Sequence, residues 1–392
     1  MKSKIAAVSL FVITAAVVVF YPVRDNTANA NNVEPVRTIT HIQKPKIQMA
    51  ILLDTSGSMS GLIDQTRNQL WQVVNQFAKS KQNGITPILE VAVYEYGNSG
   101  LSSNNGYIRQ VSGLTSELDQ VSEALFSLST NGGEEYCGFA IRTAVTGLKW
   151  SKSDNDIKAI FIAGNEPFTQ GPVSFHEAIA AAKAKGITIN TIHAGDSKTG
   201  ANTGWRDGAI LAGGDYMSIN HNHKVAHVQA PQDKRLAELN AKLNKTYVPY
   251  GSTGRLKAAR QAEQDKKSEA ISSALMSKRA QSKASPLYRN SSWDLIDAIK
   301  SGKADLSKLK DDDLPVEMRK MSKKKQIAYV EEQEQERAGI KAEINKLGAS
   351  REDYIKAKRK ESPSPAVKTM DQAVSAAVRK QGERKNFSFE AK

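Results

Sequence analysis

The stretch from Gln48 to Gly61, QMAILLDTSGSMSG, places polar oxygen atoms directly at the end of an apolar run. Residues 49–53 are apolar, as in a buried strand, and the run ends at Asp54. Ser56 and Ser58 follow at alternate positions, and the glycine between them allows a tight turn. Hard divalent cations prefer such carboxylate and hydroxyl oxygens as ligands. The sequence therefore predicts a metal site in this turn.

The pattern after this turn indicates an α/β fold. Apolar residues recur at helical spacing over 62–77, so strand, oxygen-rich turn and helix follow one another. Such a beginning is typical of doubly wound folds, whose ligands bind beyond the carboxyl ends of the strands. Strand patterns and helix patterns continue to alternate to about residue 250, which predicts a doubly wound, mostly parallel sheet. Further strands are expected at 88–96, 107–111, 158–163, 187–193 and 216–219, and helices at 116–128, 135–148, 174–186, 206–212 and 233–244.

The segment Asp54-Thr55-Ser56-Gly57-Ser58 resembles the D-x-S-x-S motif of von Willebrand factor type A (vWA) domains, which begins their metal-ion-dependent adhesion site. The resemblance covers residues 47–250. It implies that Asp54, Ser56 and Ser58 bind Mg²⁺, or else Mn²⁺ or Ca²⁺. It also implies that a protein partner offers a carboxylate to the exposed position of the ion. The alternative is an ordinary helix cap, because Asp and Ser favour such positions.

Two further loops complete the site in that family, and both depart from the pattern here. A Thr is expected after a Gly-Gly turn, but Glu134 stands there and Thr130 lies four residues earlier. An Asp is expected at the end of the fourth strand, but this chain offers Asn165. We expect Thr130 or Glu134 to complete the second loop. Asn165 is expected to act through a metal-bound water, with one negative charge lost. The alternative for Glu134 is a carboxylate in the first turn of a helix, where the helix dipole favours it.

The N-terminal segment has the features of an export signal. Lys2 and Lys4 precede an apolar run over 5–21, and Ala28-Asn29-Ala30 matches a small-residue cleavage pattern. We expect residues 1–30 to be a signal peptide or an uncleaved membrane anchor, since the run is at the short edge of what crosses a bilayer. Residues 31–46 read as a linker. Both alternatives predict an exported protein, periplasmic or secreted.

The composition changes after residue 250. Residues 251–392 hold 32 basic and 21 acidic residues and account for most of the net charge of +14. The region has few large apolar residues, which is typical of charged, solvated helices. An anionic envelope surface is a candidate counterpart. Nucleic acid is not favoured, because no aromatic residues interleave the basic runs 323–325 and 356–360. Helices are expected at 255–284, 292–300, 316–347, 350–361 and 366–381.

The remaining reactive residue types give weaker signals. Cys137 is the single cysteine, so no intramolecular disulfide forms. Its position within an amphipathic run, with no Cys-His constellation around it, favours a packed thiol over a nucleophile. His221, His223 and His227 form a cluster that suits either a zinc site or a polar loop.

The sequence favours a divalent-cation-dependent protein-binding module, used for adhesion or assembly at a bacterial cell envelope, and not an enzyme. One alternative is an envelope scaffold that binds anionic surfaces through residues 251–392. The other is a serine hydrolase that uses Ser58 or Ser60. A G-x-S-x-G nucleophile turn would place the serine at position 59, where this chain has Met59.

Overall fold

The structure is a computed structural model and describes residues 44–220, 228–361 and 370–389. The expected signal or anchor, 1–30, and most of the expected linker lie outside these ranges. The histidine cluster of His221, His223 and His227 also lies outside them. No helix within the described ranges is both long enough and apolar enough to span a membrane.

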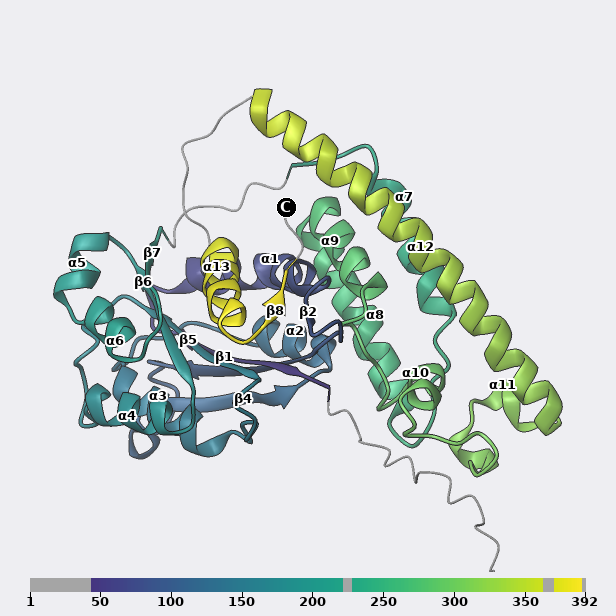
Figure 1. Cartoon of the computed structure of the whole chain (residues 1–392), viewed down its shortest axis with the longest axis horizontal. Helices are drawn as coiled ribbons and strands as arrows, with labels where there is room; N and C mark the ends of the chain where they lie inside the picture. The colour runs from purple at the N-terminus through teal and green to yellow at the C-terminus, as the bar shows by residue number, and fades with distance from the viewer. Residues whose placement is uncertain (1–43, 221–227, 362–369, 390–392) are drawn as a thin grey trace, which may run out of the picture. The chain divides into compact units, whose positions relative to one another are not determined.

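A six-stranded sheet with the order β4-β3-β1-β5-β6-β7 forms the centre of the fold (Figure 1). The strands are parallel except β4, which runs antiparallel to β3. A second, two-stranded sheet pairs β2 with β8. This architecture confirms the predicted mostly parallel α/β sheet. The strands are β1 (Lys46–Asp54), β2 (Lys81–Gln82), β3 (Ile88–Tyr96), β4 (Ile108–Thr115), β5 (Ile157–Gly164), β6 (Thr188–Ala194), β7 (Tyr216–Ile219) and β8 (Phe387–Ser388).

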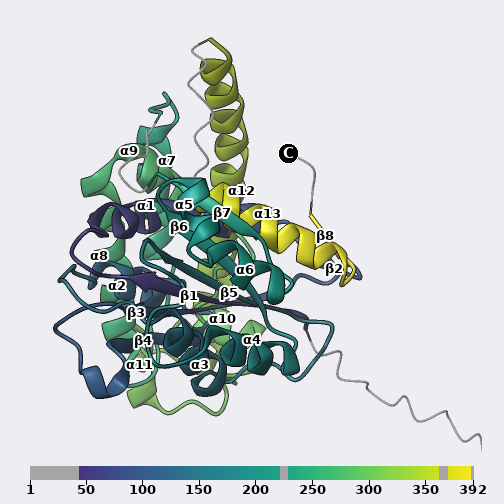
Figure 2. The ribbon, with the colours of Figure 1, turned by 90° about the vertical axis from the view of Figure 1, so that its left-hand side faces the viewer.

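Helices cover both faces of the sheet, which explains why β1 is apolar at every position from 49 to 53. Met49 and Leu53 join the core under α1 and α2, whereas Ala50 and Leu52 join the core under α3 and α4. Figure 2 shows α1 and α4 on opposite sides of the sheet. The helices up to residue 245 are α1 (Ser60–Phe77), α2 (Leu118–Phe126), α3 (Cys137–Gly147), α4 (Phe175–Ala184), α5 (Ser197–Asn202), α6 (Trp205–Leu211) and α7 (Asp233–Lys245).

The helices after residue 250 differ from the predicted ones at three points. The expected helix 316–347 is divided, because α11 ends at Arg319 and α12 begins at Lys323. The expected helix 255–284 is two helices, because Ser272 interrupts it and its hydroxyl accepts a hydrogen bond from the Leu275 N–H (3.0 Å). The expected helix end at Gly348 is wrong, because this glycine lies inside α12. A Cβ atom there would lie 2.9 Å from the Gln281 side chain, so Gly348 permits close contact with α9. The helices are α8 (Gly254–Ile271), α9 (Ser273–Ala284), α10 (Leu295–Lys300), α11 (Val316–Arg319), α12 (Lys323–Glu361) and α13 (Met370–Glu383).

These C-terminal helices pack against the sheet and its helices. Helix α13 contacts α1 and β5, α8 contacts α2, and α9 contacts α1 (Figures 1 and 2). Helix α12 lies across α7 and α9. Val374 and Val378 of α13 belong to the same hydrophobic core as Met49 of β1. The hydrophobic core is therefore continuous between residues 47–250 and 251–392.

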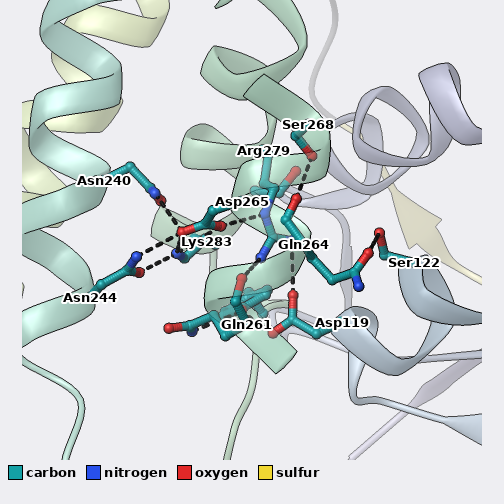
Figure 3. Close-up of polar contacts among 12 residues, drawn as sticks. Asp119, Ser122, Asn240, Asn244, Gln261, Gln264, Asp265, Ser268, Arg279 and Lys283 are labelled. Atoms are coloured by element: carbon teal, nitrogen blue, oxygen red, sulfur yellow. Dashed lines mark hydrogen bonds and ion pairs between the residues drawn. The ribbon is translucent and has the colours of Figure 1, made fainter. Parts of the chain in front are cut away.

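The expectation of solvated helices is wrong for the inward faces of this region. Four basic side chains are buried there, and each pairs with an aspartate (Figure 3 shows two of them, Arg279 and Lys283). Buried charges need such partners. Composition does not reveal the pairing, because Asp119 and Asp233 lie far from their partners in the sequence. The four are Arg279, Lys283, Arg337 and Arg351.

Candidate metal centre

The candidate centre lies at the end of β1, between two neighbouring strands. In the register of the sheet, Asp54 lies opposite Tyr96 of β3, and Leu53 lies opposite Ala163 of β5. The Thr55 N–H donates to the Tyr96 carbonyl (2.8 Å), which fixes the turn after β1. The chain continues from β1 to β3 on one side and reaches β5 on the other, so this edge is a topological switch point, where doubly wound folds bind ligands.

Asp54 and Ser56 leave two buried oxygen atoms without partners. Oδ1 of Asp54 accepts a hydrogen bond from the Ser56 N–H (2.7 Å). Oδ2 of Asp54 and Oγ of Ser56 have no hydrogen-bond partner within the described part of the chain. Burial raises the pKa of Asp54 to about 7, although the backbone N–H groups of Ser56 and Asn165 lower it. Buried oxygens of this kind are costly unless something pairs with them.

The loop before α3 brings Glu135, and not Glu134, close to Asp54 and Ser56. Glu134 is exposed and accepts a hydrogen bond from the Gln170 side chain (2.9 Å). Glu135 is buried, and its Oε2 atom has no partner among the described residues. Burial, together with the nearby Asp54 carboxylate, raises the pKa of Glu135 to about 8. The Ser56 side chain lies near both carboxylates and lowers both pKa values, although its hydroxyl completes no hydrogen bond of standard geometry.

Gly97 shows how closely the two carboxylates approach the end of β3. A Cβ atom at this position would lie 2.6 Å from Cγ of Glu135 and 2.9 Å from Oδ1 of Asp54. The two acidic side chains therefore lie against the same residue from two different loops. The sequence pattern does not single out Glu135, and its signal is the pair of glutamates after Gly132-Gly133, of which one faces inward.

The loop after β5 places Asn165 at the centre, as its strand-end position predicts. Its backbone N–H lies close enough to Asp54 to lower the pKa of that carboxyl. Its Oδ1 atom is buried and has no partner among the described residues. The carboxylate of Glu166, the next residue, raises the pKa of both Asp54 and Glu135 through its charge. The Trp205 indole N–H donates to the Glu166 carbonyl (2.8 Å) and holds this loop.

Ser58 and Thr130 take peripheral positions. The Ser58 side chain is exposed and that of Thr130 is half-buried, and within the described ranges no hydrogen bond joins either to Asp54. The Asn131 N–H donates to the Thr55 carbonyl (3.0 Å), so the loop that carries Thr130 contacts the turn after β1. Ser60, the other serine of the hydrolase alternative, is exposed.

Cys137 lies behind the centre. Its thiol is buried, as expected, and lies 3.7 Å from the Tyr96 hydroxyl, which donates to the Ala163 carbonyl (3.0 Å). Burial raises the pKa of the thiol well above its usual value. These contacts indicate a packing role.

The donor set fits a hard divalent cation. Four buried oxygen atoms without partners come from three loops: Asp54 Oδ2, Ser56 Oγ, Glu135 Oε2 and Asn165 Oδ1. The described residues contain no group of three or more histidine, cysteine or acidic side chains arranged for a metal. An ion here would thus depend on hydroxyl and amide oxygens together with carboxylates, which is the ligand chemistry of Mg²⁺, Ca²⁺ and Mn²⁺.

Comparisons with known proteins give a family match and a set of similar solved structures. A search of curated proteins finds no match. Similar solved structures include proximal thread matrix protein 1 from the mussel byssus, with a zinc-occupied MIDAS motif (13% identity, TM-score 0.34, 45% of this chain and 42% of that one). Another is BatB from Bacteroides thetaiotaomicron (16% identity, TM-score 0.34, 44% of this chain and 90% of that one). A third is the pilus adhesin SpaC from Lactobacillus rhamnosus GG (15% identity, TM-score 0.33, 46% of this chain and 28% of that one). The chain thus covers less than half of the mussel protein.

The family assignment depends on a match over the sheet itself. Residues 48–203 match the family model described as von Willebrand factor type A domain. This range begins within β1 and includes Asp54, Ser56, Glu135 and Asn165. The chain therefore contains a von Willebrand factor type A domain over residues 48–203.

Proposed function

We propose that this protein is a divalent-cation-dependent protein-binding module. Domains of the vWA family are in general non-catalytic interaction modules. The observation that carries the proposal is that Asp54, Ser56, Glu135 and Asn165 lie together at the carboxyl end of β1. Each has a buried oxygen atom without a hydrogen-bond partner among the described residues. A divalent ion would pair with these oxygens and neutralise the adjacent carboxylates, whose pKa values are raised by burial.

The partner would meet the ion from the solvent side. Ser58 and Glu134 are exposed and lie close in the chain to Ser56 and Glu135, so they mark the solvent side of the centre. The resemblance predicts that the partner offers a carboxylate there. The N-terminal segment predicts export, and we propose adhesion or assembly at a cell envelope as the setting.

Calorimetric titration of the full chain with MgCl₂ and MnCl₂ tests the proposal. We expect saturable binding by the wild type and its loss in Asp54→Ala, because that variant removes the carboxylate at the end of β1. Ser60→Ala, an exposed change in the same turn, is the matched control and should bind as the wild type does. Unchanged binding by Asp54→Ala would remove the site.

A partner assay then tests the dependence on the ion. The full chain, immobilised with Mg²⁺, is exposed to envelope extract, and captured protein is eluted with chelator. We expect capture by the wild type in Mg²⁺ and none by Asp54→Ala. Equal capture with and without chelator would overturn the proposed mode of binding.

Residues 251–392 are not favoured as an independent binding region. Part of their basic charge is buried and paired with aspartates, as for Arg279 and Arg337. Their helices also share the core of the sheet, so deletion of the region would expose apolar surface. Charge reversal at the exposed Lys356, Lys358 and Lys360 is the cleaner test. If capture followed these lysines and not Asp54, the scaffold alternative would replace the metal-dependent one.

A further inference from the structure

Two adjacent glutamates in the second loop have opposite surroundings. Glu134 is exposed and hydrogen-bonded to Gln170. Glu135 is 6% exposed, and its Oε2 atom has no partner in the described part of the chain. We propose that Glu135 is a direct ligand of the cation, so that the chain supplies a second carboxylate beside Asp54. This inference rests on the proposed function and concerns a residue that the family motif does not specify.

The backbone fixes which glutamate points inward. A Cβ atom on Gly133 would lie 2.4 Å from the Gly97 carbonyl oxygen, so only a glycine lets the loop pass this close to the end of β3. The Ser99 N–H donates to the Gly132 carbonyl (2.5 Å), which holds the same stretch. Helix α3 begins two residues after Glu135. The inward position of Glu135 therefore follows from backbone contacts on both sides of it.

Among the residues that the structure describes, no basic side chain forms an ion pair with Glu135. None of the ion pairs described in the structure involves Asp54, Glu135 or Glu166, although the three carboxylates interact electrostatically. Elsewhere in the molecule the buried Asp265 pairs with Arg279 and Lys283. Burying like charges without a counter-charge is costly. An external cation between Asp54 and Glu135 removes this cost.

The charge balance also explains the departure at Asn165. The resemblance expects an aspartate there, and the asparagine lacks its negative charge. A carboxylate from Glu135 restores that charge from the neighbouring loop. With Asp54 and Glu135 both bound, the chain itself neutralises a divalent ion. The ion is then held without the help of a partner's carboxylate.

Matched glutamine variants of the full chain test the inference. Glu135→Gln keeps the shape of the side chain and removes the charge, and Glu134→Gln makes the same change one residue away. In calorimetric titrations with MnCl₂, we expect Glu135→Gln to weaken binding about tenfold or more and Glu134→Gln to leave it nearly unchanged. In chelator, the thermal midpoint of Glu135→Gln should equal or exceed that of the wild type, because the variant removes a buried carboxyl group that no basic residue of the described ranges pairs with.

The outcomes separate this inference from the proposed function. If Asp54→Ala loses binding while Glu135→Gln binds as the wild type does, the proposed function stands and the role of Glu135 is overturned. If Glu134→Gln weakens binding as much as Glu135→Gln, the choice between the two residues is overturned. Weaker binding together with a lower midpoint in chelator would show that Glu135 supports the fold and does not ligate the ion. If Asp54→Ala still binds, the proposed function fails first.

Discussion

The molecule buries two groups of acidic side chains, and they differ in what surrounds them. In the candidate metal centre, Asp54 and Glu135 have oxygen atoms without hydrogen-bond partners, and neither forms an ion pair with a residue of the described ranges. Between α2, α8 and α9, a buried ion cluster joins Asp119 and Asp265 to two basic residues (Figure 3). The second group contains its own counter-charges, whereas the first has none among the described residues.

In the buried ion cluster, the nitrogen atoms of the basic side chains lie close to individual carboxylate oxygen atoms. Arg279 lies 2.8 Å from Asp119 Oδ1 and 2.5 Å from Asp265 Oδ1, and Lys283 lies 3.0 Å from Asp265 Oδ2. Asn240 and Asn244 each donate to the same Oδ2 atom of Asp265 (2.7 Å). The cluster thereby fixes α9 against α2, α7 and α8.

The pKa directions of the two groups express the same contrast. Burial acts to raise the pKa of Asp265, but Lys283 and Arg279 outweigh it and hold that pKa well below its usual range. Burial raises the pKa of Asp54 to about 7, and no basic residue opposes it. Burial is comparable in the two cases, so the presence of a counter-charge decides the sign. The presence of counter-charges, and not depth, therefore distinguishes the buried ion cluster from the candidate metal centre.

Loss of the cation from the buried ion cluster should have the largest effect. Arg279→Met leaves Asp119 without its ion-pair partner and Asp265 with Lys283 alone. We expect the free energy of unfolding to fall by about 3–5 kcal/mol, because a buried charge loses its partner. Urea denaturation measures this. The control is Arg235→Met, which breaks exposed pairs with Glu238 and Glu343 and should change little. A similarly small change in Arg279→Met would contradict the comparison.

The corresponding change in the metal centre should have the opposite sign in the absence of metal. Asp54→Asn keeps an acceptor for the Ser56 N–H and removes a buried carboxylate that is charged at about pH 8. We expect its thermal midpoint in chelator to equal or exceed that of the wild type. The midpoint increase on addition of MgCl₂ should disappear. A fall in chelator as steep as that of Arg279→Met would show that Asp54 is a structural charge.

The stability of the metal-free chain should depend on pH through the same two groups. Ordinary pKa values of 3.8 and 4.5 are raised to about 7 for Asp54 and about 8 for Glu135. Between these values the folded chain keeps protons that the unfolded chain has lost, so stability in chelator should fall as the pH rises from about 4 to about 8. Mg²⁺ replaces these protons, and its stabilising effect should be larger at about pH 8 than at about pH 6. Thermal unfolding across this range measures both slopes. An equal pH dependence in the double variant Asp54→Asn, Glu135→Gln would assign it to other groups.

The sequence predicts those features that depend on neighbouring residues. Strands β3 and β7 have the predicted bounds, 88–96 and 216–219, because their apolar runs are bounded by turn residues. Asp54, Ser56 and Asn165 meet at one edge because each follows a predicted strand. Their role as metal ligands remains a prediction.

The features that the sequence missed depend on distant partners or on loop geometry. Whether Glu134 or Glu135 faces inward depends on the passage of Gly133 past Gly97, which no periodicity records. A glycine such as Gly348 commonly marks the end of a helix. Its contact with Gln281 shows that here it lies within α12 and permits close packing against α9. From the sequence alone, Arg279 is expected to be exposed to solvent, because its ion-pair partner Asp119 lies on α2, far away in the sequence.

The smallest expected effect concerns the helix that carries the buried ion cluster. The Ser272 hydroxyl accepts a hydrogen bond from the Leu275 N–H and so caps α9. Ser272→Ala should lower the free energy of unfolding by about 1 kcal/mol, the usual cost of losing such a cap, while the exposed Ser273→Ala should change it less. Urea denaturation of both variants measures the difference. Mg²⁺ affinity should be unchanged in both, because α9 contributes no oxygen atom to the metal centre. A loss as large as that of Arg279→Met would mean that the cap, and not the ion pairs, fixes α9 in place.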